Sequence, residues 1–424
     1  MELIQLLKLS FVGGIVMGKL LENHSKKIIG EAGVAVPKNA VARSPEEAVE
    51  KAVEIGFPVV LKALVPVGKR GKAGAIKFAN NAQEVASLTK ELLEMTVRHY
   101  PVEKVLVEEK ISIAEEWYLS IAIDKQAKAP VIIASLDGGV DVEQLSREHP
   151  EKVLTRHIDP ILGLAEFEIK EVWSELGLTG KPLILATQAL VRLVKVFLEN
   201  DATILEINPL VLTEAGEVIA AASVMSVDDS AMYRHTELSS MVQLGSERSW
   251  QPLTELEKQM VEVNELDPYR GTARYTEMDG GDIGFLCGGG GGSLLSFDAL
   301  VSFGGKPANY SEVGGNPPER KVYGITKGIL SKPGVRGLFV AHNITNNTQV
   351  DVMAKGVVQA LKDMGKNPST FPVVVREAGV NEKDAKEIFM AAGIEYYGDD
   401  ATITEAAQRM VERLKALDVA ERGK

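Results

Sequence analysis

Short apolar runs alternate with amphipathic stretches along this chain, and the two kinds of run predict strands and helices respectively. The segment 182–200 repeats apolar residues with the period of an α-helix and predicts a long helix. Residues 57–63 form an apolar run around Lys62 and predict a buried strand. The segment 44–47 (Ser-Pro-Glu-Glu) is typical of a helix start, because serine caps, proline suits the first position and acids favour the first turn. Further predicted elements of this half are helices at 20–32 and 82–98 and strands at 103–109, 116–124, 129–135, 202–207 and 211–221, the last two separated by a loop at 208–210.

Beyond residue 280 the pattern changes to repeated strand–loop–helix units. A strand at 282–287 leads into five glycines and a helix that begins at Ser293. Such units predict a parallel sheet with right-handed crossovers, in which ligands bind at the carboxyl ends of the strands. The other units combine strands at 336–341 and 371–376 with helices at 349–364, 381–392 and 402–416.

The polar, glutamate-rich segment 226–280 lies between these two patterns and is predicted to be a connector. We therefore expect an α/β protein with one domain at 19–225 and a second at 281–424. A chain of 424 residues is long enough for two such domains, each with its own core.

Charge and cysteine content exclude several classes of protein. The formal net charge of −12 argues against nucleic acid as a partner, because a phosphate backbone needs a basic surface. Cys287 is the only cysteine, so an intrachain disulfide is impossible, and we expect a cytoplasmic protein. Residues 1–18 are apolar, but Lys8 interrupts them and the run is too short to span a membrane. We interpret this run as an N-terminal extension and expect no membrane partner.

The five glycines at 288–292 give the strongest chemical signal. Glycine lets main-chain N–H groups approach an anion closely, and the N-terminus of the following helix adds partial positive charge. A flexible turn is the alternative interpretation. The loop is not a Walker A sequence, and it is no convincing dinucleotide fingerprint because every position is glycine.

Two further features follow strands of the same half. The segment 342–348 (His-Asn-Ile-Thr-Asn-Asn-Thr) offers amide and hydroxyl groups to an oxygen-rich ligand, although Asn and Thr also serve as helix caps. Arg376 ends the next strand and is a candidate to bind a carboxylate or phosphate; a surface salt bridge is the alternative.

In the first half, four cations surround a glycine-rich loop. Lys62 ends an apolar strand, and Lys69, Arg70 and Lys72 follow among glycines. Together they suit a polyphosphate, whereas the alternative is a solvated surface loop. Further along, the sequence Leu-Glu-Ile-Asn-Pro at 205–209 offers carboxylate and amide oxygens of the kind that magnesium prefers, although this signal is weak by itself.

Together these pieces resemble the ATP-grasp subunit of the succinyl-CoA synthetase, citryl-CoA synthetase and ATP-citrate lyase family, over about residues 19–416. The resemblance implies an ATP-grasp fold to about residue 225, followed by a flavodoxin-like CoA-ligase domain. Its markers are GKRGKAG at 68–74, GGVDVE at 138–143, LEINPL at 205–210, DDSAMYR at 228–234 and PANYSEVGG at 307–315.

The resemblance also implies a site and a partner. Asn208 would be a Mg²⁺ ligand, and Glu206 would act catalytically by facing a phosphorylated histidine on an alpha-type partner subunit, which would also bind most of the CoA. The protein would be a hetero-oligomeric acid–CoA ligase that forms ADP. ATP contacts would fall on Lys62, Lys69, Arg70, Gly71, Glu108 and Glu116, and contacts to the carboxylic acid on Gly289, Gly290, Gly291, Ser293, Asn346, Thr348 and Arg376.

The acid is the least determined part of this assignment. The glycine run and the Asn346–Thr348 pair look like citrate-binding loops of ATP-citrate lyase, so citrate is favoured, with a succinyl-CoA or malyl-CoA synthetase as the alternative. One residue counts against citrate: lyase-type relatives have two arginines at 376–377, and this chain has Glu377 at the second position.

A second departure concerns the metal. The family places an aspartate where this chain has alanines at 220–222, and a lysine where it has Val224. A second hypothesis therefore remains, in which the chain is a non-catalytic paralogue that acts as a binding subunit.

Overall fold

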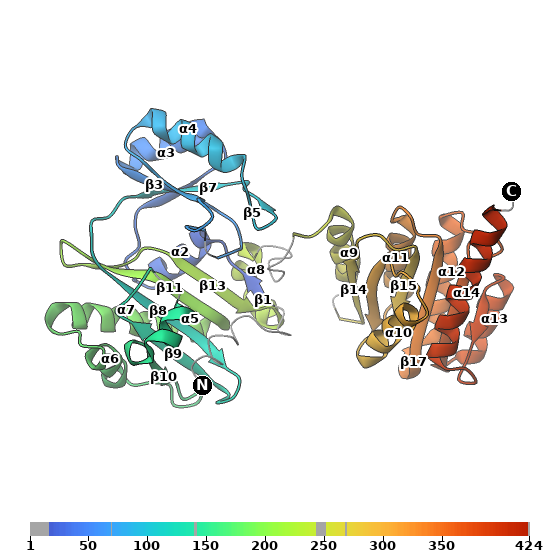
Figure 1. Cartoon of the computed structure of the whole chain (residues 1–424). Helices are drawn as coiled ribbons and strands as arrows, with labels where there is room; N and C mark the ends of the chain where they lie inside the picture. Colours follow the sequence, from blue (N-terminus) through green and yellow to red (C-terminus); the bar gives the residue numbers. More distant parts are fainter. Residues whose placement is uncertain (1–16, 69, 140–141, 243–251, 268, 423–424) are drawn as a thin grey trace. The chain divides into compact units, whose positions relative to one another are not determined.

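The computed structural model describes residues 17–424, except for 69, 140–141, 243–251, 268 and 423–424. The chain divides into two compact units, residues 1–252 and 253–424, called here unit 1 and unit 2 (Figure 1). Within the described residues, no helix has both the length and the apolar character needed to cross a bilayer.

Unit 1 contains two main sheets. The larger one is antiparallel throughout and carries α2 (Glu22–Glu31), α6 (Glu166–Glu175) and α7 (Gly180–Glu199). The predicted helix at 182–200 is confirmed by α7, whose apolar side packs into the largest core of the unit. The strand order is β1 (Met17–Lys19), β13 (Ser223–Asp228), β11 (Ala202–Thr213), β8 (Ile113–Asp124), β9 (Ala129–Ser135) and β10 (Leu154–His157), with β12 (Val218–Ala220) paired to β11.

The smaller sheet has four strands, in the order β2 (Asn39–Ala42), β7 (Val105–Glu109), β3 (Val59–Ala63) and β4 (Ile76–Ala79). Helices α3 (Pro45–Ile55) and α4 (Ala82–Leu93) cover one of its faces (Figure 1). The predicted start of α3 is confirmed, because the Ser44 side chain accepts a hydrogen bond from the Glu47 N–H. The remaining elements of unit 1 are β5 (Thr96–Val97), β6 (Tyr100–Pro101), α5 (Val142–Glu148), η1 (Pro150–Lys152), η2 (Asp229–Arg234) and α8 (Thr236–Met241).

One predicted loop of unit 1 does not exist as such. Residues 208–210 lie within β11, whose pairing with β8 shifts register between Ile207 and Leu210. The prediction of two strands was wrong because this irregularity carries the proline through the ladder without ending the strand.

Unit 2 is a layered α/β fold, and its six-stranded sheet is parallel apart from the edge strand β14. Helices α10 (Gly291–Ser302) and α14 (Ile403–Arg422) pack on one face, and α9 (Glu255–Glu265), α11 (Glu319–Ser331), α12 (Val350–Asp363) and α13 (Glu382–Ala391) pack on the other (Figure 1). The predicted parallel sheet with alternating helices is confirmed. Its order is β14 (Thr272–Glu277), β16 (Asn309–Gly314), β15 (Ile283–Cys287), β17 (Gly337–Gln349), β18 (Val373–Val380) and β19 (Glu395–Tyr397).

Two segments of this half differ from the sequence-based expectation. Within the expected connector 226–280, α9 and β14 pack as part of unit 2 and bury Met260, Ala273 and Tyr275. Each of these elements has one exposed side, which explains the polar composition of the segment. Residues 342–348, expected to form a loop, extend β17 instead, because they continue to pair with β18.

Candidate functional site

Two of the four predicted phosphate-binding cations of unit 1, Lys62 and Arg70, lie in a buried network of charges, whereas Lys72 is exposed. Lys62 Nζ on β3 donates to Glu108 Oε1 at 2.9 Å, to Glu22 Oε1 at 3.1 Å and to the carbonyl of Ala221 at 2.7 Å. Lys26 Nζ meets the same groups: it pairs with Glu22 Oε1 at 2.9 Å, donates to the Ala221 carbonyl at 2.8 Å, and makes a short bond to Glu108 Oε2. The two ammonium groups therefore share Glu22 Oε1 and the Ala221 carbonyl, and each binds one oxygen of Glu108.

Arg70 joins the same network from the glycine-rich loop. It pairs with Glu22 Oε2 and donates to the Ala63 carbonyl at 3.1 Å. The loop folds back on itself, since the N–H of Ala75 bonds to the Arg70 carbonyl. Gly71 lies in this turn and is exposed, whereas Lys69 lies outside the described residues. The structure thus brings together Lys62, Arg70 and Glu108 of the predicted nucleotide contacts.

Burial and charge act against each other in this cluster. Burial by itself would raise the pKa of Glu22, but Lys62, Arg70 and Lys26 hold the pKa well below its usual value. Burial lowers the pKa of Lys26, in opposition to Glu22. For Lys62 the attraction of Glu22 and Glu108 prevails over burial and raises the pKa. Three cations and two carboxylates meet here, so the cluster carries one excess positive charge, which suits an anionic ligand.

The remaining predicted residues of unit 1 gather where β8 and β11 meet the turn after β9. The N–H of Gly139 donates to Asn208 Oδ1 at 2.9 Å, and a Cβ on Gly139, whose φ is +68°, would lie 2.2 Å from Glu116 Oε2. A Cβ on Gly138 would meet main-chain atoms of Trp117 at 2.5 Å. Only glycine therefore lets this turn come so close to Glu116 and Asn208. Glu206 lies on β11 two residues before Asn208, and Asn208 Nδ2 approaches Glu206 Oε1 at 3.5 Å.

The position that the resemblance predicts for a metal ion is poorer in oxygen than the family pattern. The N–H of Asn208 bonds to the Ala222 carbonyl at 3.3 Å, so the alanines lie directly beside the predicted metal ligand. Val224 is paired with Glu206 across the strands and is 38% exposed. Among the described residues, no three His, Cys, Asp or Glu side chains are grouped to hold a metal ion. Asp228 cannot replace the missing aspartate, because it ends β13, six extended residues or about 20 Å beyond Ala222, which directly precedes that strand.

The glycine run of unit 2 opens α10. Gly289–Gly291 are exposed at its N-terminus, directly after the buried strand β15. Ser293 is buried, and its hydroxyl is bonded to the Gly290 carbonyl, Tyr310 and Glu312. Ser293 therefore stabilises the buried side of the turn through hydrogen bonds. The glycines on the exposed side of the turn leave their main-chain N–H groups accessible to an anion.

The extension of β17 lies at the same edge of the sheet. Asn346 is exposed, and Thr348 is buried, with Oγ1 accepting a hydrogen bond from the Asn316 N–H at 3.2 Å. A Cβ on Gly292 would come 2.5 Å from the Asn343 amide, so this segment touches the glycine turn. The structure thus assembles the glycine turn and the 342–348 segment at the carboxyl edge of the sheet.

Arg376 and Glu377 point in different directions. The Arg376 guanidinium is 7% exposed and donates to the carbonyls of His342, at 2.6 Å, and Ala401, at 3.0 Å. The Glu377 carboxylate is fully buried, with Oε1 2.9 Å from His342 Nδ1. These two side chains do not align as a hydrogen bond, and neither has another hydrogen-bond partner in the described part of the chain.

Sequence reasoning missed Glu22, Lys26 and His342. Glu22 and Lys26 share the buried side of α2 with Ile29. Charged residues at helical spacing from an apolar residue were therefore the sequence signal that could have indicated a buried ion pair. His342 was regarded as one polar residue among several, and only its cross-strand position beside Glu377 reveals its burial.

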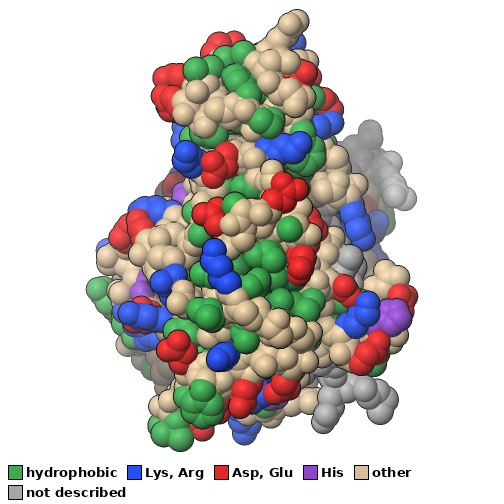
Figure 2. Space-filling model, turned by 90° about the vertical axis from the view of Figure 1, so that its left-hand side faces the viewer, with side chains coloured by type: hydrophobic (Ala, Val, Ile, Leu, Met, Phe, Trp, Pro, Cys, Tyr) green, Lys and Arg blue, Asp and Glu red, His purple; other side chains and the backbone are tan. Residues whose placement is uncertain are grey.

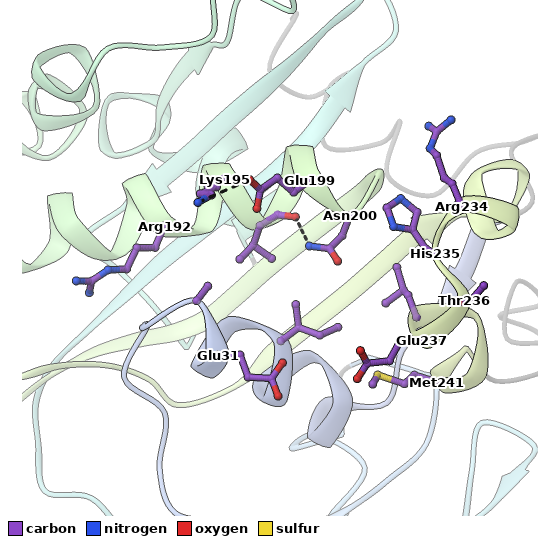
Figure 3. A pocket seen from close by; sticks show the side chains of 14 residues that line it. Glu31, Arg192, Lys195, Glu199, Asn200, Arg234, His235, Thr236, Glu237 and Met241 are labelled. Atoms are coloured by element: carbon purple, nitrogen blue, oxygen red, sulfur yellow. Dashed lines mark hydrogen bonds and ion pairs between the residues drawn. The ribbon is translucent and has the colours of Figure 1, made fainter.

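A separate pocket of about 590 Å³ lies between α2, α7 and α8 (Figure 3). It contains none of the predicted site residues. Its charged groups are of both signs, and several are already bonded to residues behind the pocket lining: Arg192 donates to the Gly33 carbonyl, and Arg234 and His235 bind Asp201. The face of unit 1 in Figure 2 likewise mixes acidic and basic side chains. We assign no ligand to this pocket.

The fold and the site define an ATP-grasp protein joined to a CoA-ligase type α/β unit, and comparisons with known proteins agree. Residues 19–212 match the model of the ATP-grasp domain, and residues 254–413 match that of the ATP citrate lyase citrate-binding family. The GDP-forming succinate–CoA ligase subunit beta of Thermus thermophilus is 37% identical over 393 residues, covering 92% of this chain and 98% of the relative. The ADP-forming succinate–CoA ligase subunit beta of Methanothermobacter thermautotrophicus is 35% identical over 400 residues, covering 94% of this chain and 100% of the relative.

A solved structure of ATP citrate lyase from Methanothrix soehngenii, in complex with citrate and coenzyme A, superposes with a TM-score of 0.77 at 20% identity, covering 93% of this chain and 100% of that chain. At this identity it supports the fold alone. The chain belongs to the family of succinate–CoA ligase beta subunits. The predicted resemblance and fold class are thereby confirmed, and the chain is an acid–CoA ligase subunit.

Proposed function

We propose that this chain is the ATP-binding subunit of an ADP-forming citrate–CoA ligase that works with an alpha-type partner subunit. The observation that carries the choice of citrate is the match of residues 254–413 to a citrate-binding family, in the unit that exposes Gly289–Gly291 beside Asn346. Main-chain N–H groups at the start of a helix suit a carboxylate.

In the proposed reaction, the γ-phosphoryl group of ATP passes to a histidine of the partner, and ADP leaves. The phosphoryl group then passes to a carboxylate of the acid, and the CoA thiolate displaces phosphate to form the thioester. Lys62, Arg70 and the glycine-rich loop would hold the nucleotide phosphates, and Glu116 would contact the nucleotide. Glu206 would face the histidine of the partner.

Magnesium would be held by the Asn208 oxygen and by phosphate oxygens of the nucleotide. Asn208 Oδ1 accepts one hydrogen bond and keeps a second lone pair, so it fits this role. The ion would neutralise the charge that develops on the phosphoryl group.

The experiment is an ADP-release assay of this chain co-expressed with its partner subunit, with citrate, succinate and malate compared at equal CoA. We expect continued release of ADP, beyond the first ADP per histidine that phosphorylation yields, only when citrate and CoA are both present. Release with succinate or malate but not with citrate would overturn the choice of acid. An unchanged rate in Glu206→Gln would overturn the assigned role of Glu206.

A second function, a binding subunit without turnover, is favoured by one observation: alanine lies where the family has a metal-binding aspartate, beside Asn208. The two functions differ in one measurement. If the complex binds ATP but transfers no ³²P from its γ-position to the partner, the chain is a binding subunit.

A further inference from the structure

Glu22 occupies the centre of the charged cluster of unit 1. Its Oε1 accepts from Lys26 at 2.9 Å and from Lys62 at 3.1 Å, and its Oε2 binds Arg70. The side chain is 1% exposed. Glu22 thus binds two of the four cations that the sequence assigns to a polyphosphate, Lys62 and Arg70, together with Lys26, which the sequence did not assign.

Lys62 has no donor to spare for a ligand. An ammonium group has three N–H donors, and those of Lys62 have three acceptors, in Glu22, Glu108 and Ala221. A phosphate oxygen can bind Lys62 only if one of these acceptors withdraws. The bond to Glu22 is the longest of the three, and Glu22 is also the acceptor that occupies Arg70.

The positions of the three acceptors indicate which one yields. Glu108 lies on β7, next to β3 in the same sheet, and therefore moves with Lys62. Glu22 lies on α2, which packs against the larger sheet, so the Glu22–Lys62 bond joins the two sheets of unit 1. An arriving phosphate repels a carboxylate but not the neutral Ala221 carbonyl. After losing Lys62, Glu22 would still be paired with Lys26, four residues along the same helix.

We propose that Glu22 is an intramolecular competitor for the phosphate groups of the nucleotide. In the absence of ligand its carboxylate holds Lys62 and Arg70; when the nucleotide binds, the phosphate oxygens take both cations and Glu22 keeps Lys26. Glu22 thereby sets the affinity of the site for polyphosphate. This inference rests on the proposed binding of ATP by unit 1.

The decisive variant is Glu22→Asp in the full-length chain. The shorter carboxylate draws back from Lys62 and Arg70 by about 1.5 Å, the length of one C–C bond, without a change of charge. The matched control is Glu31→Asp, the same change on the same helix at a side chain that is 65% exposed and paired with Lys27.

Binding of Mg·ATP, of pyrophosphate and of adenosine is measured by calorimetry. We expect Glu22→Asp to bind Mg·ATP and pyrophosphate at least threefold more tightly than the wild type, and adenosine equally well. Glu31→Asp should match the wild type for all three ligands. Equal or weaker binding of Mg·ATP by Glu22→Asp overturns the proposal, as does an equal gain for adenosine.

Glu22→Gln provides an independent readout. It leaves three buried cations with one carboxylate, so we expect a lower Tm without nucleotide and a larger rise of Tm on addition of Mg·ATP than in the wild type. If Glu22→Gln does not fold without nucleotide, the affinities measured for Glu22→Asp still test the proposal. Absence of ATP binding by the wild type would overturn the proposed function, whereas binding that Glu22→Asp does not tighten would overturn only the role of Glu22.

Discussion

Restoring a carboxylate at position 222 tests whether the metal position limits this protein. The Ala222 carbonyl accepts the N–H of Asn208, and its side chain is half-buried, so an aspartate there would lie beside the predicted metal ligand and keep part of its hydration. We predict that Ala222→Asp tightens the binding of magnesium in the ATP complex.

The size of the gain follows from charge. A carboxylate about 4 Å from a divalent ion gains roughly 8 kcal/mol at an effective dielectric constant of about 20, twice the value for two unit charges. Desolvation of the ion and the carboxylate cancels most of this. We therefore expect Ala222→Asp to raise the affinity for the metal by about 10- to 100-fold. This is the range seen when groups around metal ligands are changed.

The assay titrates Mg²⁺ at fixed ATP and records the half-saturating concentration. The matched control is Ala221→Asp, because the Ala221 side chain packs in an apolar cluster with Val211 and Ile219. A carboxylate buried there lacks a partner, so this control should lower the Tm and leave the magnesium dependence unimproved. A gain below threefold in a folded Ala222→Asp protein would refute the reasoning, and so would an equal gain in Ala221→Asp.

Two further predictions concern stability. The fully buried Asn309 side chain accepts a hydrogen bond from the Phe285 N–H at 3.0 Å and donates one to the Phe285 carbonyl at 2.7 Å. Asn309→Ala should therefore lower the free energy of unfolding of unit 2 by about 2–4 kcal/mol in a urea titration. A loss below about 1 kcal/mol would contradict this prediction. Hydrogen bonds from Arg234 and His235 lower the pKa of Asp201 to about 2, so its stabilisation is complete above the unfolded pKa of about 3.9 and is lost as the pH falls through 2. Asp201→Asn should therefore cost about 1 kcal/mol at pH 7, allowing for its exposure, and this cost should shrink as the pH falls from about 4 and vanish well below pH 2. A cost independent of pH in urea titrations would contradict this assignment.

Regular elements with a strong apolar period could be predicted from the sequence. The helix at 182–200 and the strand at 129–135 are found almost residue for residue, because burial of one face or of a whole run determines them locally. The 342–348 extension of β17 could not be predicted, because its side chains, apart from Ile344, are polar and most of the segment is exposed, and only main-chain pairing with β18 makes it a strand.

In the candidate site, too, some features could be predicted from local sequence and others depend on the folded structure. Residue type and loop composition pointed to Lys62, Arg70 and the glycine turn at 288–292. The pairing of Lys62 with Glu22 depends on the packing of α2 against the larger sheet, which no local pattern reports. Gly138 and Gly139 belonged to a recognised sequence marker, yet their physical reason, the close approach to Trp117 and Glu116, exists only in the folded chain.

The choice between citrate and succinate depends on how charge is balanced in unit 2. Successive side chains of a strand point to opposite faces, so Arg376 and Glu377 serve different surroundings. Arg376 is engaged by two carbonyls, and Glu377 faces His342 under the glycine turn. If the acid binds at this edge as proposed, the edge would offer it mainly the N-terminus of α10, equivalent to roughly half a positive charge. Half a charge balances a tricarboxylate less well than a dicarboxylate. Citrate is therefore a suitable acid only if further cations come from the partner subunit, and a partner without basic side chains at this edge would favour succinate.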